Sequence, residues 1–276
     1  MAVESLPQAE LIVKQQERAQ RTFRVRVIAW WGVIFAALIF IFSGARIEIG
    51  PLTIQTIQLD WEFIQRVSPI IRQGIVVTLL ISVTSIIIAS ILALLTALAR
   101  LSRIAFLYAL STFYVSVIRG TPLILQIVFF FLALPQMGRI LDATLSGILA
   151  LSLNYGAYMS ETFRAGIQGV GKGQREAALA LGMTQGQLMR RIVLPQALRI
   201  VIPPVGNDFI AMLKDSALVS TLGFVRDLMW YGQNQGRREF RSLEALIIVA
   251  MWYWVMTIAF TWLQSRVEKR MARGDR

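Results

Sequence analysis

Long apolar stretches separated by short basic segments occupy most of the chain, and each has close to the length that crosses a lipid bilayer. About 20 apolar residues in a helix cover the hydrocarbon core. We therefore expect an all-α integral membrane protein with six transmembrane helices. The six candidate spans are residues 27–44, 74–99, 104–137, 143–160, 198–213 and 245–264.

Two of these candidate spans carry helix-breaking residues. The third contains Arg-Gly-Thr-Pro at 119–122, and the fifth contains Pro203 and Pro204. Proline removes a backbone donor and glycine permits unusual dihedral angles, so we expect a break at 119–122. An arginine at membrane depth is costly unless it reaches an interface or faces a wet cavity. The sequence leaves open whether 104–118 enters the bilayer or lies along its inner surface.

The second candidate span has one face of small residues. Gly74, Thr78, Ser82, Ser85 and Ala89 follow one another at steps of three and four. Small side chains let a neighbouring helix approach closely, so we interpret this face as a packing surface. The alternative is that Thr78 or Ser82 lines a transport path.

Composition and charge agree with a membrane protein. The 276 residues are 56% hydrophobic with mean hydropathy +0.60, and there is no Cys and no His. Thiolate and imidazole chemistry is thereby excluded, and we expect no metal site. Lys and Arg concentrate at 1–26, 100–103, 164–191 and 266–276, which six spans place on one side. The positive-inside rule then makes both termini cytoplasmic, and it explains the net charge of +12 without a nucleic-acid partner.

The arginines between residues 214 and 241 fit this rule poorly, because they fall on the side predicted to be outer. Acidic residues in the same segment balance them only in part, and acidic residues count little in the rule.

Polar residues inside the spans are candidates for a substrate path. Asn154, Tyr158 and Glu161 lie on one helical face. A carboxylate facing lipid is costly, so Glu161 faces either the path or a partner such as Arg164. Asn207 and Asp208 are possible ligands for the polar groups of a zwitterion, or they join neighbouring helices. The full set of candidates is Arg119, Thr121, Gln126, Asn154, Tyr158, Glu161, Asn207 and Asp208.

The polar loop at 172–195 has the pattern of two short helices around a turn. Glu-Ala-Ala-Leu-Ala-Leu from Glu176 consists of strong helix formers, and Gly182 is suited to the left-handed residue that ends a helix. A second helix at 185–193 is expected to end at Pro195, because the residue before a proline is biased away from helix.

This loop resembles the EAA loop of permease subunits of binding-protein-dependent ABC transporters. The resemblance rests on Glu176, Ala177, Ala178, Gly182, Ile192, Leu194 and Pro195, which it implies to be the ATPase-coupling residues. The strings at 119–126, 154–166 and 172–178 are similar to motifs of the polar amino-acid branch (His, Glu, Gln, Arg and opine importers). The implied fold is a five-helix type I importer (MetI-like) core at 70–266, with the coupling loop at 172–195. An extra first helix and outer segment at 27–69 would precede it, between cytoplasmic tails at 1–26 and 267–276.

The resemblance also implies partners. It predicts an inner-membrane permease for polar L-amino acids that works with a dimer of ABC ATPase subunits, a periplasmic or extracellular solute-binding protein, and a second permease subunit of the same or a related chain. We expect no catalysis and no cofactor on this chain, with ATP and Mg²⁺ bound by the ATPase. Gly-x-x-x-x-Gly-Lys at 166–172 lacks the Ser or Thr of a phosphate-binding loop. The alternative function is an ion-coupled secondary amino-acid transporter, in which Glu161 or Asp208 carries the ion.

Overall fold

The computed structural model describes residues 6–49 and 52–272. The chain divides into two compact units, Met1–Glu62 and Phe63–Arg276. The second unit begins shortly before residue 70, where the core was expected to start. Residues 1–5 and 273–276 of the two expected tails lie outside the described residues.

The first unit is a long helix followed by a hairpin. Helix α1 runs from Leu6 to Ile41 and therefore includes most of the expected N-terminal tail. Strands β1 (Arg46–Ile49) and β2 (Leu52–Gln55) pair antiparallel, with Arg46 opposite Gln55 and Ile49 opposite Leu52. This short hairpin was not predicted, whereas the rest of the described chain bears out the all-α class. Alternating isoleucines and a threonine favour short strands, and Gly-Pro at 50–51 is a turn signal in the sequence.

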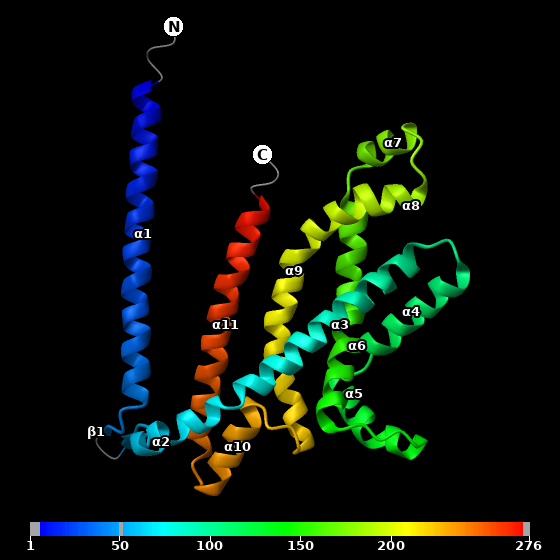
Figure 1. Ribbon diagram of the computed structural model, residues 1–276. Helices are drawn as coiled ribbons and strands as arrows, with labels where there is room; N and C mark the ends of the chain where they lie inside the picture. The colour runs from blue at the N-terminus through cyan, green and yellow to red at the C-terminus, as the bar shows by residue number, and fades with distance from the viewer. Residues whose placement is uncertain (1–5, 50–51, 273–276) are drawn as a thin grey trace. The chain divides into compact units, whose positions relative to one another are not determined.

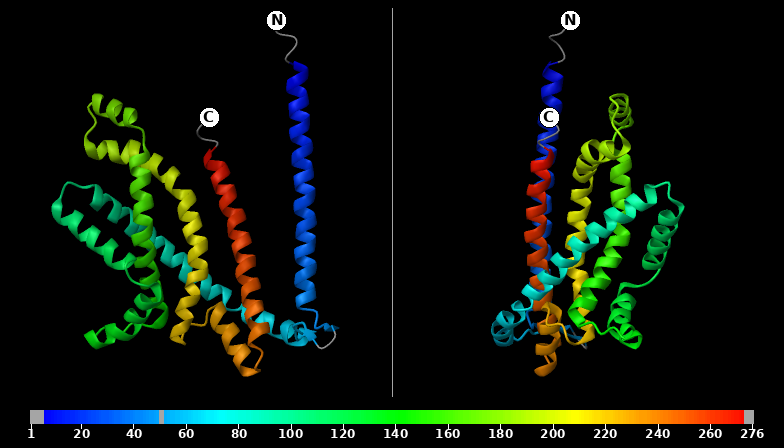
Figure 2. Two further views of the ribbon diagram at one scale, coloured as in Figure 1. Left: turned by 180° about the vertical axis from the view of Figure 1, so that it is seen from behind. Right: turned by 45° about the vertical axis from the view of Figure 1, so that its right-hand side comes forward.

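The second unit is entirely helical within its described residues. Its elements in chain order are α2 (Trp61–Arg72), α3 (Ile75–Leu101), α4 (Ala105–Arg119), α5 (Leu123–Val128), η1 (Phe129–Ala133), η2 (Leu134–Met137), α6 (Ala143–Gly169), α7 (Lys172–Ala180), α8 (Gln185–Leu188), η3 (Met189–Val193), α9 (Leu194–Asp215), η4 (Ser216–Leu222), α10 (Leu228–Arg238) and α11 (Ser242–Ala272). Figures 1 and 2 show α7, α8, the α3–α4 turn and the end of α11 toward one end of this unit. Helices α2, α5 and α10 lie toward the other end.

Helix α6 is the centre of the unit, packed between α3 and α9 (Figure 1). The small-residue face of α3 is buried, as the spacing predicted: Thr78, Ser82, Ser85 and Ala89 are fully buried. Its first part meets the start of α10, where the Thr78 hydroxyl accepts from the Leu228 N–H at 3.2 Å. The Ser85 hydroxyl donates to the Ile148 carbonyl of α6 at 3.4 Å. Such close contact between backbones requires small side chains on both helices.

The break expected at 119–122 is present. Helix α4 ends at Arg119, and the chain resumes as α5 after a bend of 104°. The candidate span at 104–137 is therefore not one straight helix. Pro122 supplies no N–H to continue the α4 ladder, and it begins α5 instead. The Tyr114 hydroxyl donates to the Leu153 carbonyl at 2.6 Å and attaches α4 to α6.

Within the described residues, three helical segments are long and apolar enough to cross a membrane: Arg18–Ile41, Trp61–Leu101 and Ser242–Met271. The bent pair Ala105–Arg119 and Leu123–Met137 makes up to four. Helices α6 and α9 have 27 and 22 residues and extend about 40 and 33 Å, but they are not among these apolar segments, so the count of six spans stays a prediction. The polar serines of α6 do not face lipid, because Ser146, Ser152 and Ser160 are buried inside the bundle.

Candidate functional site

The segment 172–195 folds as a compact helical knob at one end of the second unit (Figure 1). Helix α7 ends in a Schellman arrangement. The Gly182 N–H donates to the Leu179 carbonyl at 2.9 Å, and the Met183 N–H donates to the Ala178 carbonyl at 3.1 Å. Gly182 has φ +78°, a left-handed conformation that glycine adopts without a Cβ penalty. The sequence prediction for this turn is confirmed.

The second helix of the knob begins with a capping box that was not predicted. The Thr184 hydroxyl accepts from the Gln187 N–H at 3.3 Å, and the Gln187 side chain accepts from the Thr184 N–H at 3.0 Å. Thr-x-x-Gln is a recognised helix-start signal and was available in the sequence.

The prediction that Pro195 ends this helix is wrong. Leu194 has helical dihedrals (φ −61°, ψ −44°), and the chain passes from α8 through the π-helical turn η3 directly into α9. Proline at the second position of α9 lacks the donor that a regular helix would need, and its ring would crowd the carbonyl four residues earlier. The wider π turn accommodates both effects without ending the helix.

The knob is anchored to the bundle by apolar contacts and by one arginine. Ala178, Leu188 and Val193 are buried in the main core cluster. The Arg175 guanidinium donates to the Ile167 carbonyl, which lies in the last turn of α6 and has no intrahelical partner. A cation at a helix C-terminus also interacts favourably with the helix dipole. These contacts attach the knob to the end of α6.

The remaining knob residues point away from the bundle. Glu176, Ala177, Gly182 and Pro195 are exposed, and Leu181 at the tip is 81% exposed. Ile192 and Leu194 are half-buried and pack against the core. Glutamate, small residues and an exposed leucine together form a protruding surface with a mixed polar and apolar character, which is typical of a docking element.

A second feature is a pocket of about 390 Å³ between α6, α9 and the break after α4. Four of the eight predicted path residues line it, namely Thr121, Asn154, Tyr158 and Asp208. Two polar lining residues were not predicted: Tyr155 and Asp215, whose side chains form a hydrogen bond of 2.7 Å. No local pattern predicts this pair, because 60 residues separate its members.

The other four candidates surround the pocket or lie away from it. Gln126 is buried and fixes the break, since its amide donates to the Ile118 and Thr121 carbonyls at 2.8 and 3.2 Å and its oxygen accepts from Asn154 at 3.1 Å. The Arg119 guanidinium lies 4.9 Å from the centre of the Tyr158 ring. Such stacking is a cation–π contact.

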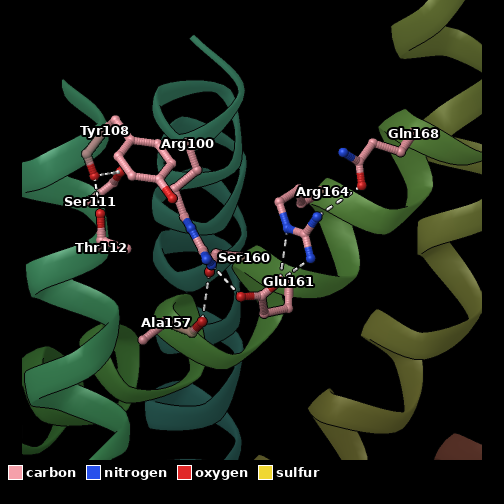
Figure 3. Close-up of polar contacts among 9 residues, drawn as sticks. All are labelled: Arg100, Tyr108, Ser111, Thr112, Ala157, Ser160, Glu161, Arg164 and Gln168. Carbon is pink, nitrogen blue, oxygen red and sulfur yellow. Dashed lines mark hydrogen bonds and ion pairs between the residues drawn. The ribbon is translucent and has the colours of Figure 1, made fainter. Parts of the chain in front are cut away.

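Glu161 lies one turn beyond Tyr158 on α6, between two arginines (Figure 3). Arg100 of α3 pairs with one carboxylate oxygen. Arg164 donates to the other from Nε and Nη2 at 2.9 and 2.8 Å. The pairing with Arg164 was foreseen as one alternative. The contact with Arg100 was not, because it depends on how α3 crosses α6.

Asn207 turns toward α11. Its side-chain oxygen accepts from the Gln264 amide at 3.0 Å, so Asn207 joins α9 to α11. Of the two roles considered for this residue, substrate ligand or link between helices, the structure shows the link. Among residues 6–49 and 52–272, no group of three or more acidic side chains is placed to hold a metal ion.

Comparison with known proteins gives consistent results. The family described as "Binding-protein-dependent transport system inner membrane component" matches residues 91–273. The arginine transport system permease protein ArtQ of Bacillus subtilis (strain 168) is 38% identical over 208 residues, 75% of this chain and 94% of that protein. The glutamine transport system permease protein GlnP of Escherichia coli (strain K12) is 34% identical over 216 residues, 78% and 98% of the two chains. The crystal structure of an amino acid ABC transporter with histidines superimposes with a TM-score of 0.72 at 38% identity, covering 78% of this chain and 100% of that one.

Proposed function

The chain belongs to the family of binding-protein-dependent transport system inner membrane components and is a permease subunit of an amino-acid ABC transporter. From this premise we propose that the protein imports polar L-amino acids. We further propose that it is coupled to its ATPase through the knob at 172–195. The observation that carries the proposal is the knob itself. It is anchored by Arg175 and buried apolar residues, while Glu176 and Leu181 remain exposed.

The proposed mechanism is alternating access. A solute-binding protein delivers the amino acid to one face of the membrane, and closure of an ATPase dimer moves the knobs of two permease chains. Because the π turn η3 leads directly into α9, movement of the knob would be transmitted along α9 to Asp208 at the pocket. We place α7, α8 and both termini on the cytoplasmic side, and α10 on the outer side, with six spans between.

The pocket supplies groups that suit an amino acid. Asp208 and Asp215 can accept from an ammonium group, and Asn154, Thr121 and Tyr158 can both donate and accept. Glu161 continues the same face of α6 toward the knob, so the path we propose runs from the pocket past the Arg100–Glu161–Arg164 cluster.

The first experiment is co-expression of this chain with the ATPase and binding protein encoded beside it. The complex is purified by a tag on this chain, and ATP hydrolysis is measured in proteoliposomes with a panel of amino acids. Co-purification with ligand-dependent hydrolysis supports the importer and identifies its substrate. Uptake that follows an ion gradient, without an associated ATPase, would establish the secondary transporter instead.

Substitutions at the knob test the coupling role. Glu176→Lys and Gly182→Arg are expected to abolish uptake while the protein still inserts. Gly138→Arg is a matched control for the glycine. It has the same left-handed conformation (φ +76°) and the same open surroundings, but it lies near the other end of the unit. Normal uptake by both knob variants, or equal loss in the control, would contradict the coupling assignment.

Substitutions on α9 test the path. Asp208→Asn should raise the KM for the transported amino acid about tenfold, the effect of losing roughly 1.4 kcal/mol of binding free energy. Asn207→Ala is the control, because the side chain of Asn207, next to Asp208 in the chain, contacts Gln264 rather than the pocket. A KM unchanged in Asp208→Asn would remove this residue from the proposed path.

A further inference from the structure

The loop that leads into α10 carries a completely buried aspartate. Asp227 is 0% exposed, and its Oδ1 atom accepts from the Trp230 N–H at 2.8 Å, which makes it the N-cap of α10. Its Oδ2 atom is also buried and has no hydrogen-bond partner among the described residues. Buried polar atoms in native proteins are nearly always hydrogen-bonded, so an unpartnered carboxylate oxygen requires an explanation.

A second unpartnered polar atom lies near it, on α11. The Tyr253 hydroxyl is buried without a hydrogen-bond partner in the described chain, and it interacts electrostatically with Asp227. The hydroxyls of Thr78 and Ser216 are close to it but outside hydrogen-bonding geometry. Both of these residues are 0% exposed. Four side chains from α3, η4, α11 and the start of α10 therefore form one buried polar cluster, namely Thr78, Ser216, Asp227 and Tyr253.

Close backbone packing holds α3 against the start of α10. A Cβ on Gly74 would lie 2.5 Å from the Asp227 backbone, so this contact requires a glycine. One turn further along α3, the Thr78 hydroxyl accepts from the Leu228 N–H at 3.2 Å. The position of the Asp227 carboxyl is thus fixed from both sides of its own peptide unit.

The polar cluster is connected to the pocket through η4. The Ser216 hydroxyl donates to the Leu213 carbonyl at 2.8 Å, so its oxygen can still accept a hydrogen bond. Ser216 directly follows Asp215, whose carboxylate lines the pocket and accepts from the Tyr155 hydroxyl. A change in the contacts of Ser216 would therefore move a group that lines the pocket.

The Asp227 carboxyl is influenced by burial and by backbone N–H groups of α10, and no cation among the described residues balances it. Arg226 is exposed, and its guanidinium lies 5.7 Å from the centre of the Trp230 ring. Burial raises the pKa of the Asp227 carboxyl to about 7. A neutral carboxyl can donate from Oδ2 to the Tyr253 oxygen, and the Tyr253 hydroxyl can then donate to Ser216. One proton would thereby give both unpartnered atoms a hydrogen bond.

We propose that Asp227 is a positioning residue for transport, which in its protonated form holds Tyr253 and, through it, Ser216. The turn that carries Asp215 then stays at the edge of the pocket. Loss of the proton to the outer solution leaves a negative charge in the buried cluster, which loosens this turn and weakens binding of the amino acid. The inference rests on the proposed importer function, which places α10 on the outer side of the membrane.

The experiment measures the KM and the maximal rate of uptake by the full importer complex in proteoliposomes whose internal pH is held constant. The outer pH is set about one unit below and about one unit above the pKa of Asp227. The probe is the radiolabelled amino acid that gives the largest stimulation of ATP hydrolysis in the panel described above.

Asp227→Asn and Tyr253→Phe are compared with the wild type. Asparagine caps a helix as well as aspartate does, so Asp227→Asn keeps the N-cap and removes the titration. Asp142→Asn is the matched control. Asp142 caps α6 by accepting from the Thr144 N–H at 2.9 Å, but it is exposed and lies outside the polar cluster.

The wild-type KM should be about fivefold lower at the lower pH, the effect of about one hydrogen bond, while the maximal rate changes little. Asp227→Asn should keep the low KM at both pH values, because its amide donates to Tyr253 without a titrating proton. Tyr253→Phe should have the high KM at both, because the connection to Ser216 is cut. The control should follow the wild type.

An Asp227→Asn complex with the wild-type dependence on pH would overturn the proposal, since another group would then be titrating. Wild-type KM values in Tyr253→Phe would overturn the connection from Asp227 to the pocket. A wild-type KM that is the same at both pH values would also overturn it, while the measured uptake would leave the importer intact. A wild-type complex that takes up no amino acid would overturn the importer proposal, and this one with it.

Discussion

Replacing Glu161 by glutamine should destabilise the second unit, because the carboxylate holds two arginines together. Arg100 of α3 and Arg164 of α6 both pair with it (Figure 3). Glutamine keeps the shape but removes the negative charge, and its amide has only one accepting oxygen. The two guanidinium groups would then remain close together without the anion between them.

The magnitude follows from the exposure of the three side chains. Hydrogen bonds to charged groups contribute about 1.5–3 kcal/mol when buried, and solvent-exposed ion pairs about 0–1 kcal/mol. The side chains of Arg100, Glu161 and Arg164 are 18%, 30% and 35% exposed, so the cluster lies between these limits. We expect Glu161→Gln to lose about 2 kcal/mol after solvent screening is taken into account, which lowers the Tm by about 4–8 °C.

Thermal unfolding of the purified chain in detergent measures this loss. A double-mutant cycle with Arg100→Gln should give a coupling free energy of about 1 kcal/mol, because each change removes the same contact. The control Gln168→Ala deletes the 2.8 Å hydrogen bond from Arg164 but leaves the carboxylate in place, and it should stay within about 0.5 kcal/mol of the wild type. A Glu161→Gln protein as stable as this control would refute the reasoning.

Three further predictions concern packing, capping and pH. Gly166→Ala should cost about 1–3 kcal/mol, because its Cβ would lie 2.4 Å from a methyl group of Val201; adding Val201→Ala should restore most of the loss in a thermal melt. Thr184→Ala removes the capping box of α8 and should cost the knob about 1 kcal/mol, seen as faster amide hydrogen exchange at 185–188, and unchanged exchange would count against it. Burial raises the pKa of the Asp227 carboxyl to about 7, whereas in the unfolded chain it is about 3.9. The folded state therefore binds this proton more strongly than the unfolded chain. The contribution of the protonated carboxyl to the free energy of unfolding is complete below about pH 4 and is lost as the pH rises to about 7. Asp227→Asn should remove that decline from a plot of Tm against pH, and an unchanged slope would contradict the assignment.

Local signals in the sequence determined much of the helical architecture. The small residues of α3 at steps of three and four predicted a buried packing face, and Thr78, Ser82 and Ser85 are buried. Gly182 predicted a left-handed turn, and the break at 119–122 was foreseen. Each of these depends on the conformational preferences of a few consecutive residues or on the period of one helix. The knob at 172–195 was recognisable for the same reason.

Other local signals were outweighed by their surroundings. Pro195 was expected to end a helix, yet the π turn before it keeps the chain helical into α9. A proline biases its neighbour only weakly compared with the burial of Val193 and Ala197 on either side of it. The hairpin of β1 and β2 was not predicted, although its alternating residues favour strands, because they were assigned only to an outer segment.

The sequence alone determined the membrane class, most of the helices and the exposed knob, whereas the tertiary structure decided which polar groups meet. Arg100 and Glu161 are 61 residues apart, and Tyr155 and Asp215 are 60 apart. Arg66 of α2 likewise meets Glu239, which lies 173 residues later in the chain. Such pairs depend on the angle and offset at which helices cross. Those are set by close packing over the whole bundle, so no segment of the sequence contains them by itself.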